Sequence, residues 1–155
     1  MIDGIDGLAI SIFIIWYLFI TNFLTQISNT EILILIPCVY FLLLNYKGKI
    51  FLGDSGTYFL ATFISLTIIY RYNFDPYFKY TTAGSILILL GIPGIDMIRL
   101  VILRLFKLKN PLKADNNHLH HILIKKYGWK VTIIIYTSSV IIFNSLFFFS
   151  ILPII

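Results

Sequence analysis

The sequence contains little charge and almost no cysteine. Charged residues make up only 12% of its 155 residues, which is about half the share in an ordinary globular domain. Its single cysteine, Cys38, excludes a disulfide within the chain and a cysteine-rich zinc site. Hydrophobic residues make up 59%, and mean hydropathy is +0.91. One small core could not bury that much apolar surface, so the composition predicts an integral membrane protein.

Apolar segments recur along nearly the whole chain, over residues 8–24, 32–46, 55–70, 83–103 and 131–155. A helix rises about 1.5 Å per residue and must cross about 30 Å of hydrocarbon. The second and third segments are slightly short, and we expect them to rely on helical flanks or on burial in a bundle. We therefore predict an all-α, polytopic membrane helical bundle with about five transmembrane helices. It forms a single membrane domain over residues 1–155, with no soluble domain.

The fourth apolar segment is interrupted by Gly91-Ile92-Pro93-Gly94. Proline removes a backbone donor and clashes with the preceding turn, so we expect this helix to be broken. A broken helix is tolerated at membrane depth where it faces protein or a water-filled cavity. Asp96 and Arg99 follow at a spacing that lets them pair on one helix face. A structural ion pair and a catalytic role are both open for Asp96.

Lysine and arginine are distributed unequally if the spans alternate in direction. One side then carries Lys47, Lys49, Arg104, Lys107, Lys109, Lys113, Lys125, Lys126 and Lys130. The other side carries only Arg71 and Lys79. Cytoplasmic loops are enriched in these residues, so the first side is predicted to face the cytosol. Most of the carboxylates and all three histidines fall on that side too. This grouping predicts a site for an anionic, phosphorylated, cytosolic substrate beside lipid.

Three loops contribute to the predicted site, and the first contains Asp3 and Asp6. Their spacing places both carboxylates on one face of a helical turn, at a helix start where anions are stabilised. The adjacent Gly4 and Gly7 allow close approach of a ligand. Ligand binding is the favoured interpretation of the pair, and helix capping is the alternative for either residue.

The second loop contains Asp54, which lies between small residues at the mouth of the third span. An aspartate in such a place is a functional hypothesis by default. Mg²⁺ takes oxygen ligands and often uses only one or two carboxylates, with water and substrate phosphate completing its shell. Asp54 suits that role. The alternative is that Asp54 or Ser55 merely caps the third helix.

The third loop is basic and contains Lys113, Asp115, His118, His120 and His121. Histidine near neutral pH can donate to phosphate oxygens or transfer a proton, so this pattern predicts a phosphate or metal site. Zinc is the weaker option, since the chain contains no His-Glu-x-x-His motif. Adhesion to anionic headgroups would explain the lysines but not the histidines. We expect the loop to lie outside the core, so that His120→Ala lowers turnover without unfolding the chain.

Two other families of membrane enzymes with aspartate motifs do not fit. An intramembrane aspartyl protease needs Gly-x-Gly-Asp, but Phe51 stands at the first of these positions. A CDP-alcohol phosphotransferase needs further spaced aspartates after its Asp-Gly segment, and here a wholly apolar segment follows Asp6-Gly7.

Four motifs, in order, resemble those of the polyprenyl-phosphate N-acetylhexosamine-1-phosphate transferases, a glycosyltransferase family. Residues 3–8 are similar to its Asp-Gly-x-Asp-Gly-Leu segment, and residues 51–57 to its Phe-Met-Gly-Asp-x-Gly-Ser loop. Residues 92–96 resemble its Leu-Pro-x-x-Asp segment in a broken helix. Residues 111–121 resemble its Pro-x-x-x-Asp-x-x-His-x-His-His loop.

The resemblance implies transfer of an N-acetylhexosamine 1-phosphate from a UDP-sugar to undecaprenyl phosphate, with release of UMP. This reaction starts the synthesis of a cell-envelope polysaccharide or glycan. The implied cofactor is Mg²⁺, or Mn²⁺ in its place, held by Asp54. Phe51 would pack on the nucleotide base, and the histidines would lie beside the diphosphate. The implied catalytic residues are Asp54, His118, His120 and His121, and the implied substrate-binding residues are Asp3, Asp6, Phe51, Lys113 and Asp115.

The resemblance covers only the second half of the family's longer chain. The Asp-Asp-x-x-Asp motif of its first half is missing from this sequence. We therefore expect a fragment that is inactive alone, with an N-terminal half or a second copy as partner. One alternative is a shortened active enzyme that takes its missing carboxylates from another chain. The other is a noncatalytic membrane subunit, or a remnant that binds UDP-sugar. We expect a multi-pass protein of the bacterial cytoplasmic membrane, surrounded by lipid, with its site facing the cytosol and no nucleic-acid partner.

Overall fold

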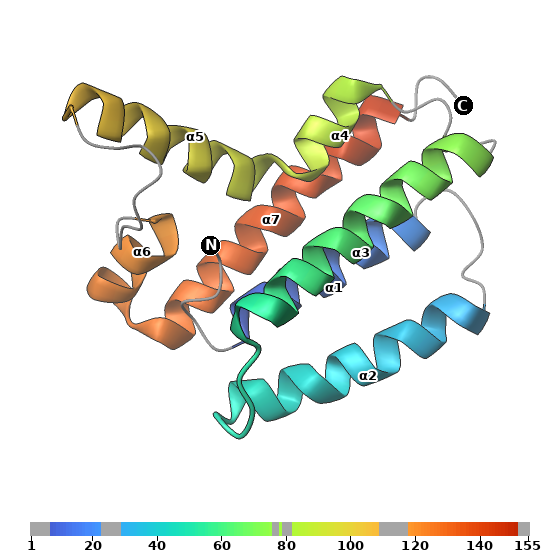
Figure 1. Ribbon diagram of the computed structural model, residues 1–155, viewed down its shortest axis with the longest axis horizontal. Coiled ribbons are helices and arrows are strands. Elements are labelled where there is room, and N and C mark those ends of the chain that lie inside the picture. Colours follow the sequence, from blue (N-terminus) through green and yellow to red (C-terminus); the bar gives the residue numbers. More distant parts are fainter. Residues whose placement is uncertain (1–6, 23–28, 76–77, 79–81, 109–117, 152–155) are drawn as a thin grey trace.

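A computed structural model describes residues 7–22, 29–75, 78, 82–108 and 118–151 (Figure 1). These residues form α1 (Leu8–Asn22), α2 (Asn29–Tyr46), α3 (Gly53–Phe74), α4 (Ala83–Leu89), α5 (Gly91–Phe106), α6 (Leu119–Tyr127) and α7 (Trp129–Ile151). No strand occurs among them. The all-α prediction is therefore confirmed. The predicted apolar segments correspond to α1, α2, α3, the pair α4 and α5, and α7, whereas α6 was not expected.

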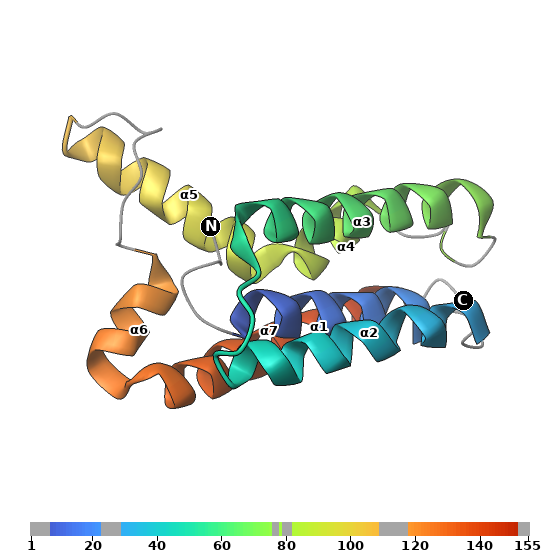
Figure 2. The ribbon, with the colours of Figure 1, turned by 60° about the horizontal axis from the view of Figure 1, so that its bottom comes forward.

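The core is built around α1, which packs against α2, α3 and α7 (Figures 1 and 2). Phe13 and Tyr17 of α1 stack with ring centroids 5.9 Å apart and lie in one buried cluster with Ile64 of α3. Ile12 of α1 and Tyr136 of α7 belong to a second buried cluster. Helices in lipid are held together mainly by such close packing, so α1 fixes the positions of its three neighbours.

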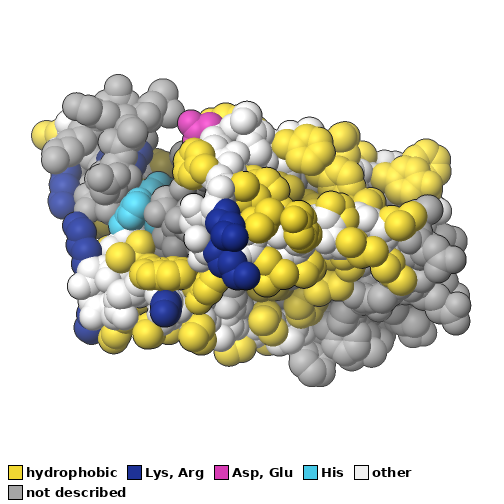
Figure 3. Space-filling view, turned by 90° about the horizontal axis from the view of Figure 1, so that it is seen from below, with side chains coloured by type: hydrophobic (Ala, Val, Ile, Leu, Met, Phe, Trp, Pro, Cys, Tyr) yellow, Lys and Arg dark blue, Asp and Glu magenta, His cyan; other side chains and the backbone are white. Residues whose placement is uncertain are grey.

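The outer surface of the bundle is largely apolar. Large hydrophobic side chains point outward from several helices, with Leu33 65% exposed, Leu66 61% and Ile142 66%. Figure 3 shows apolar side chains over much of one face, with lysine and arginine gathered toward one end. An apolar exterior with a charged end is expected for helices surrounded by lipid.

Fewer of the described helices are long and apolar enough to cross a membrane than the sequence predicts. Among the described residues only α7 is long and apolar enough by itself to cross a membrane, over Trp129–Leu146. The helices α4 and α5 are long and apolar enough only when they are taken together as one bent pair. The apolar parts of α1 and α2 are shorter. The predicted count of about five spans therefore stays a prediction.

The predicted break in the fourth segment is confirmed. Helix α4 ends at Leu89, α5 begins at Gly91, and their axes are bent by 85°. Pro93 lies in the first turn of α5, where its missing N–H needs no partner within the helix. A Cβ on Gly91 would lie 2.0 Å from the ring of Phe143 in α7. The bend therefore places the backbone at Gly91 directly against α7, where only glycine fits.

Gly91→Ala is expected to destabilise the chain by about 1–3 kcal/mol, because its methyl group would displace the Phe143 ring from a packed contact. Gly94→Ala is the matched control, since nothing lies within 4 Å of a Cβ at that position of the same helix. Alanine there should stabilise α5 by up to about 1 kcal/mol. Unfolding of both variants in detergent, followed by circular dichroism, measures the difference. Equal stability of the two variants would contradict the packing contact.

Candidate functional site

The candidate site lies at one end of the bundle, where α1, α3 and α7 begin, α2 ends and α6 is attached (Figures 1 and 2). We call residues 7, 45–54 and 118–130 the basic end. Its described cations are Lys47, Lys49, Lys125, Lys126 and Lys130. Arg71 lies near the other end of α3, paired with Asp75 at 2.9 Å. The structure thus brings Asp54, the histidines and most described cations to the same end of the molecule.

Asn45 joins the first two predicted loops. This buried side chain accepts a hydrogen bond from the N–H of Gly7, which directly follows Asp6. Its amide nitrogen donates to the carbonyl oxygen of Ile50 at 2.7 Å. The next residue after Asn45, Tyr46, has its ring centroid 5.0 Å from that of Trp129, and this contact links α2 to α7. The start of α1, the α2–α3 turn and the start of α7 are therefore held together.

Asp54 is exposed in the first turn of α3. Gly53 adopts a φ of +65°, which favours glycine, and this conformation allows the sharp turn into the helix. The cap position is Leu52, and no side chain caps the helix. The capping alternative for Asp54 and Ser55 is therefore wrong. No described residue forms a hydrogen bond or ion pair with the Asp54 carboxylate, and the helix start stabilises its negative charge.

Phe51 contributes to the lining of a cavity of about 690 Å³ between α1, α2 and α3. Its ring is 73% exposed. The lining, which includes Cys38, Leu52 and Phe59, is almost wholly apolar. This cavity offers few groups for phosphate chemistry, and packing of Phe51 on a nucleotide base stays a prediction.

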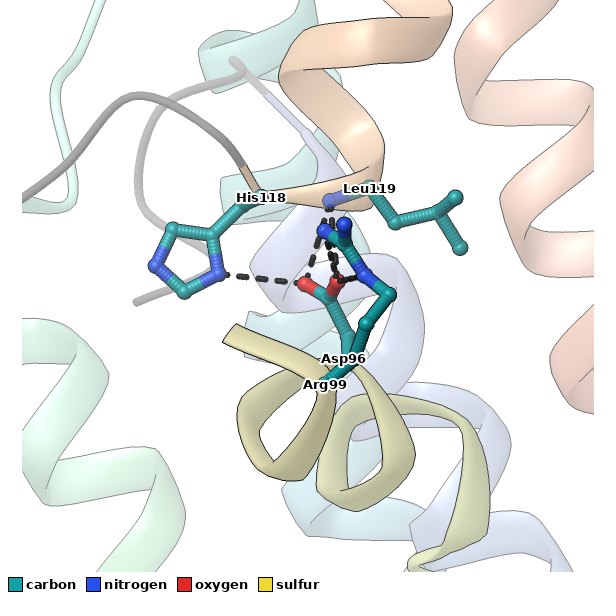
Figure 4. Close-up of polar contacts among 4 residues, drawn as sticks. All are labelled: Asp96, Arg99, His118 and Leu119. Carbon is teal, nitrogen blue, oxygen red and sulfur yellow. Dashed lines mark hydrogen bonds and ion pairs between the residues drawn. The ribbon is translucent and has the colours of Figure 1, made fainter. Parts of the chain in front are cut away.

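Asp96 is the centre of a polar cluster in which α5 meets the start of α6 (Figure 4). Its carboxylate is 5% exposed and pairs with Arg99 at 2.8 Å, as the spacing predicts. His118 lies at the same carboxylate, with Nδ1 3.1 Å from Oδ2. The backbone N–H of Leu119 donates to both carboxylate oxygens, at 3.0 and 3.1 Å. Asp96 therefore connects the broken helix to the histidine segment.

The three histidines form a ring cluster, but they do not lie in a loop outside the core. Helix α6 begins at Leu119, so His120 and His121 are helical. Ring centroids are 4.3 Å apart for His120 and His121 and 5.4 Å apart for His118 and His120. His120 is 1% exposed and its ring approaches that of Tyr136 edge-on. The expectation that His120 lies outside the core is wrong, because α6 folds its side chain against α7.

Burial lowers the pKa of two of these histidines. Burial, together with the neighbouring His121 and His118, lowers the pKa of His120 from 6.5 to about 4. Burial and the charge of His118 also lower the pKa of His121. His120 is therefore neutral at pH 7, and its ring can offer one N–H donor and one acceptor rather than a positive charge.

A second cavity, of about 300 Å³, lies against this cluster. Trp16, Asp96, His118, His120 and Tyr136 contribute to its lining. Both ring nitrogens of His120 and the indole N–H of Trp16 are buried without a hydrogen-bond partner among the described residues. Buried polar atoms are normally paired, so this cavity combines apolar walls with unused polar groups.

The predicted site is only partly within the described residues. Asp3, Asp6, Lys113 and Asp115 lie outside them. Among the described residues, no group of three or more histidine, cysteine, aspartate or glutamate side chains could hold a metal ion. Asp54 could contribute one carboxylate to a metal shared with a ligand, which is as much as Mg²⁺ often takes from a protein.

Asp96 is not among the site residues predicted from the sequence. Its position in an apolar segment that proline interrupts is the sequence signal that could have identified it as a site residue. Its contact with His118 spans 22 residues and has no local sequence pattern. Sequence reasoning therefore identified the histidines without the carboxylate that holds one of them.

Comparisons with known proteins confirm the resemblance predicted from the four motifs. The model of Glycosyl transferase family 4 matches residues 1–72. An undecaprenyl-phosphate alpha-N-acetylglucosaminyl 1-phosphate transferase of Thermotoga maritima is 29% identical over 148 residues, which are 94% of this chain and 45% of that protein. The Escherichia coli K12 transferase of the same name is 27% identical over 143 residues, 81% of this chain and 36% of that protein.

A transferase of the same name from Pasteurella multocida is 35% identical over 81 residues, 51% of this chain and 22% of that protein. No solved structure matches the chain. The chain thus spans less than half the length of these curated relatives.

Proposed function

We propose that this chain, a relative of glycosyl transferase family 4, acts in the transfer of an N-acetylhexosamine 1-phosphate from a UDP-sugar to undecaprenyl phosphate. The observation that carries the proposal is the alignment of 94% of the chain with a transferase of that kind. The exposed Asp54 and the histidine cluster, at the basic end of an apolar bundle, support it. We place the chain in the bacterial cytoplasmic membrane as a multi-pass protein, with the basic end facing the cytosol.

The basic end suits a substrate that carries phosphate. Its lysines attract anions over a distance of about 10 Å at moderate salt. When its ring is doubly protonated, His118 can donate to a phosphate oxygen through Nε2, the ring nitrogen that does not face Asp96. In this assignment the outer apolar surface faces lipid, where the acceptor resides. A soluble nucleotide sugar and a lipid phosphate would therefore meet at this end of the bundle.

Asp54 is the described residue that would hold Mg²⁺, since its carboxylate is exposed and has no partner among the described residues. The ion would neutralise charge on the diphosphate and on the departing UMP. Asp3 and Asp6 would bind near the nucleotide. Phe51 would pack on the base, and Lys113 and Asp115 would complete the phosphate site.

In the proposed reaction a phosphate oxygen of the lipid attacks the phosphorus that carries the sugar. The bond from that phosphorus to the bridging oxygen breaks, and UMP leaves with the bridging oxygen. The protein's contribution is to place the two phosphates in line and to stabilise charge, which carry most of the catalysis in phosphoryl transfer. His118 and the lysines would hold the phosphates in that arrangement.

A noncatalytic UDP-sugar-binding subunit is the second candidate. The observation that favours it is that no group of three or more histidine, cysteine, aspartate or glutamate side chains among the described residues could hold a metal ion. Such a protein would bind the nucleotide sugar at the basic end without transferring it.

Release of UMP tests the proposal, and because the chain is expected to be inactive alone, it is reconstituted together with the N-terminal half of a family relative. The two parts in vesicles containing undecaprenyl phosphate should release UMP from UDP-N-acetylglucosamine when Mg²⁺ is present, and EDTA should stop the reaction. Vesicles without undecaprenyl phosphate are the control. Protection of the chain against heat by UDP-N-acetylglucosamine and Mg²⁺, without UMP release, would support the binding subunit instead. If the chain shows neither UMP release nor protection against heat, both candidates are wrong.

A further inference from the structure

Four donors converge on the carboxylate of Asp96. Arg99 donates through Nε at 3.2 Å and through Nη2 at 2.8 Å. The third donor is Nδ1 of His118 and the fourth is the backbone N–H of Leu119. The carboxylate is 5% exposed. A buried charge that is fully satisfied in this way is held in one orientation.

The ion pair with Arg99 determines which proton His118 carries. An ionised carboxylate only accepts hydrogen bonds, so Nδ1 of His118 must be the donor. The neutral ring then has its lone pair on Nε2, which points away from Asp96 (Figure 4). A carboxylate behind an imidazole in this way fixes both its tautomer and its orientation.

Asp96 also caps helix α6 from another helix. The cap residue of α6 is His118, and its own side chain caps nothing. The N–H of Leu119 is one of the donors that the first turn of a helix leaves unpaired, and Asp96 accepts it. A carboxylate at this place also complements the positive end of the α6 dipole. The same side chain therefore fixes where α6 begins and how His118 is turned.

We propose that Asp96 is a positioning residue, which holds His118 as the Nδ1–H tautomer and presents Nε2 to the phosphates of the substrate. The substrate part of this inference rests on the proposed function. Within the reaction, Nε2 donates to a phosphate oxygen when the ring is doubly protonated, and when the ring is neutral it can accept the proton of a monoprotonated lipid phosphate. Asp96 itself touches no substrate and acts only through His118 and the start of α6.

The tautomer of His118 in the wild-type chain is the first test. The chain contains only three histidines, so ¹⁵N-histidine labelling gives a short NMR spectrum, and His118→Gln assigns the His118 signals. In the neutral form of the His118 ring we expect protonated Nδ1 and unprotonated Nε2. A proton on Nε2 instead would overturn the proposal.

Asp96→Asn is the second test. The Asn oxygen can still accept from Leu119, which turns the amide N–H₂ toward His118 and makes Nδ1 an acceptor. We expect the proton of His118 to move to Nε2. Asp96→Glu, which keeps a carboxylate, should retain the wild-type tautomer. Asp75→Asn is the matched control, because it breaks the Arg71 ion pair at the far end of α3, and it should leave the His118 signals unchanged. An unchanged tautomer in Asp96→Asn would overturn the proposal.

UMP release connects this arrangement to the reaction. Asp96→Asn should lower kcat about 10- to 100-fold, with a smaller effect on KM for the UDP-sugar, and Asp96→Glu should restore part of it. When His118 is already replaced by alanine, adding Asp96→Asn should lower kcat little further, because the two residues act together. Additive losses would overturn the positioning role. The NMR measurements need no turnover, so they test the tautomer of His118 even if the proposed transfer is wrong.

Discussion

Asp54→Asn is expected to reduce UMP release by at least about a hundredfold, because a metal bound to diphosphate supplies several kcal/mol of charge stabilisation. Because Asp54 is exposed, we expect the substitution to lower activity without unfolding the chain. Its carboxylate forms no hydrogen bond or ion pair with a described residue, so the substitution removes no such interaction from the folded chain. The stability cost should be limited to the helix-dipole contribution of about 0.3–1 kcal/mol.

Dependence on the Mg²⁺ concentration makes this test more specific. Asp54→Glu keeps the charge but moves the oxygens, so it should need more Mg²⁺ for half-maximal release. Ser55→Ala in the same turn is the control for local disturbance, and it should retain activity. Release at the wild-type rate by a folded Asp54→Asn variant would remove the metal role from this residue.

Acidification should destabilise the chain through His120. The pKa of His120 is about 4 in the folded chain and about 6.5 when the side chain is exposed. Between these values the unfolded chain binds a proton that the folded chain excludes, so stability falls as pH falls. The full difference corresponds to about 3 kcal/mol, of which about 2 kcal/mol is lost between pH 7.5 and pH 5. The contribution is fully present above about pH 6.5.

The measurement is the free energy of unfolding of the chain in mixed micelles, at several pH values from 7.5 to 5. His120→Gln removes the titrating group and keeps a polar side chain, so its stability should depend much less on pH. His121→Gln is the matched control, because His121 is only partly buried and should account for less of the slope. A wild-type slope retained in His120→Gln would show that other groups cause the acid sensitivity. His120→Ala should unfold more readily than the wild type, contrary to the sequence-based expectation.

Local sequence patterns predict most of the fold because each helix depends on local composition. Apolar runs identify α1, α2, α3 and α7, and the Gly91–Gly94 segment identifies the break. The same patterns do not identify α6, which has nine residues and carries its apolar side chains among histidines and lysines. Its helix is stabilised by packing on α7 and by a cap from Asp96, and both come from distant parts of the chain.

The candidate site was predicted by residue type rather than by arrangement. Scarce carboxylates and histidines on one predicted side were enough to single out Asp54 and His118. The burial of His120 could not be predicted, because it depends on where α6 meets Tyr136. The link from Asp96 to His118 depends on an 85° bend between α4 and α5, which no local pattern measures.

The contact between Tyr46 and Trp129 gives the chain an optical reporter of its own. The chain has only two tryptophans. Trp16 lies beside the smaller cavity, and Trp129 lies at the basic end. Replacing Trp16 by phenylalanine leaves a single indole emitter, with a tyrosine ring 5.0 Å away. Its fluorescence colour and lifetime then report whether the end of α2 and the start of α7 stay together while lipid, nucleotide or acid is added.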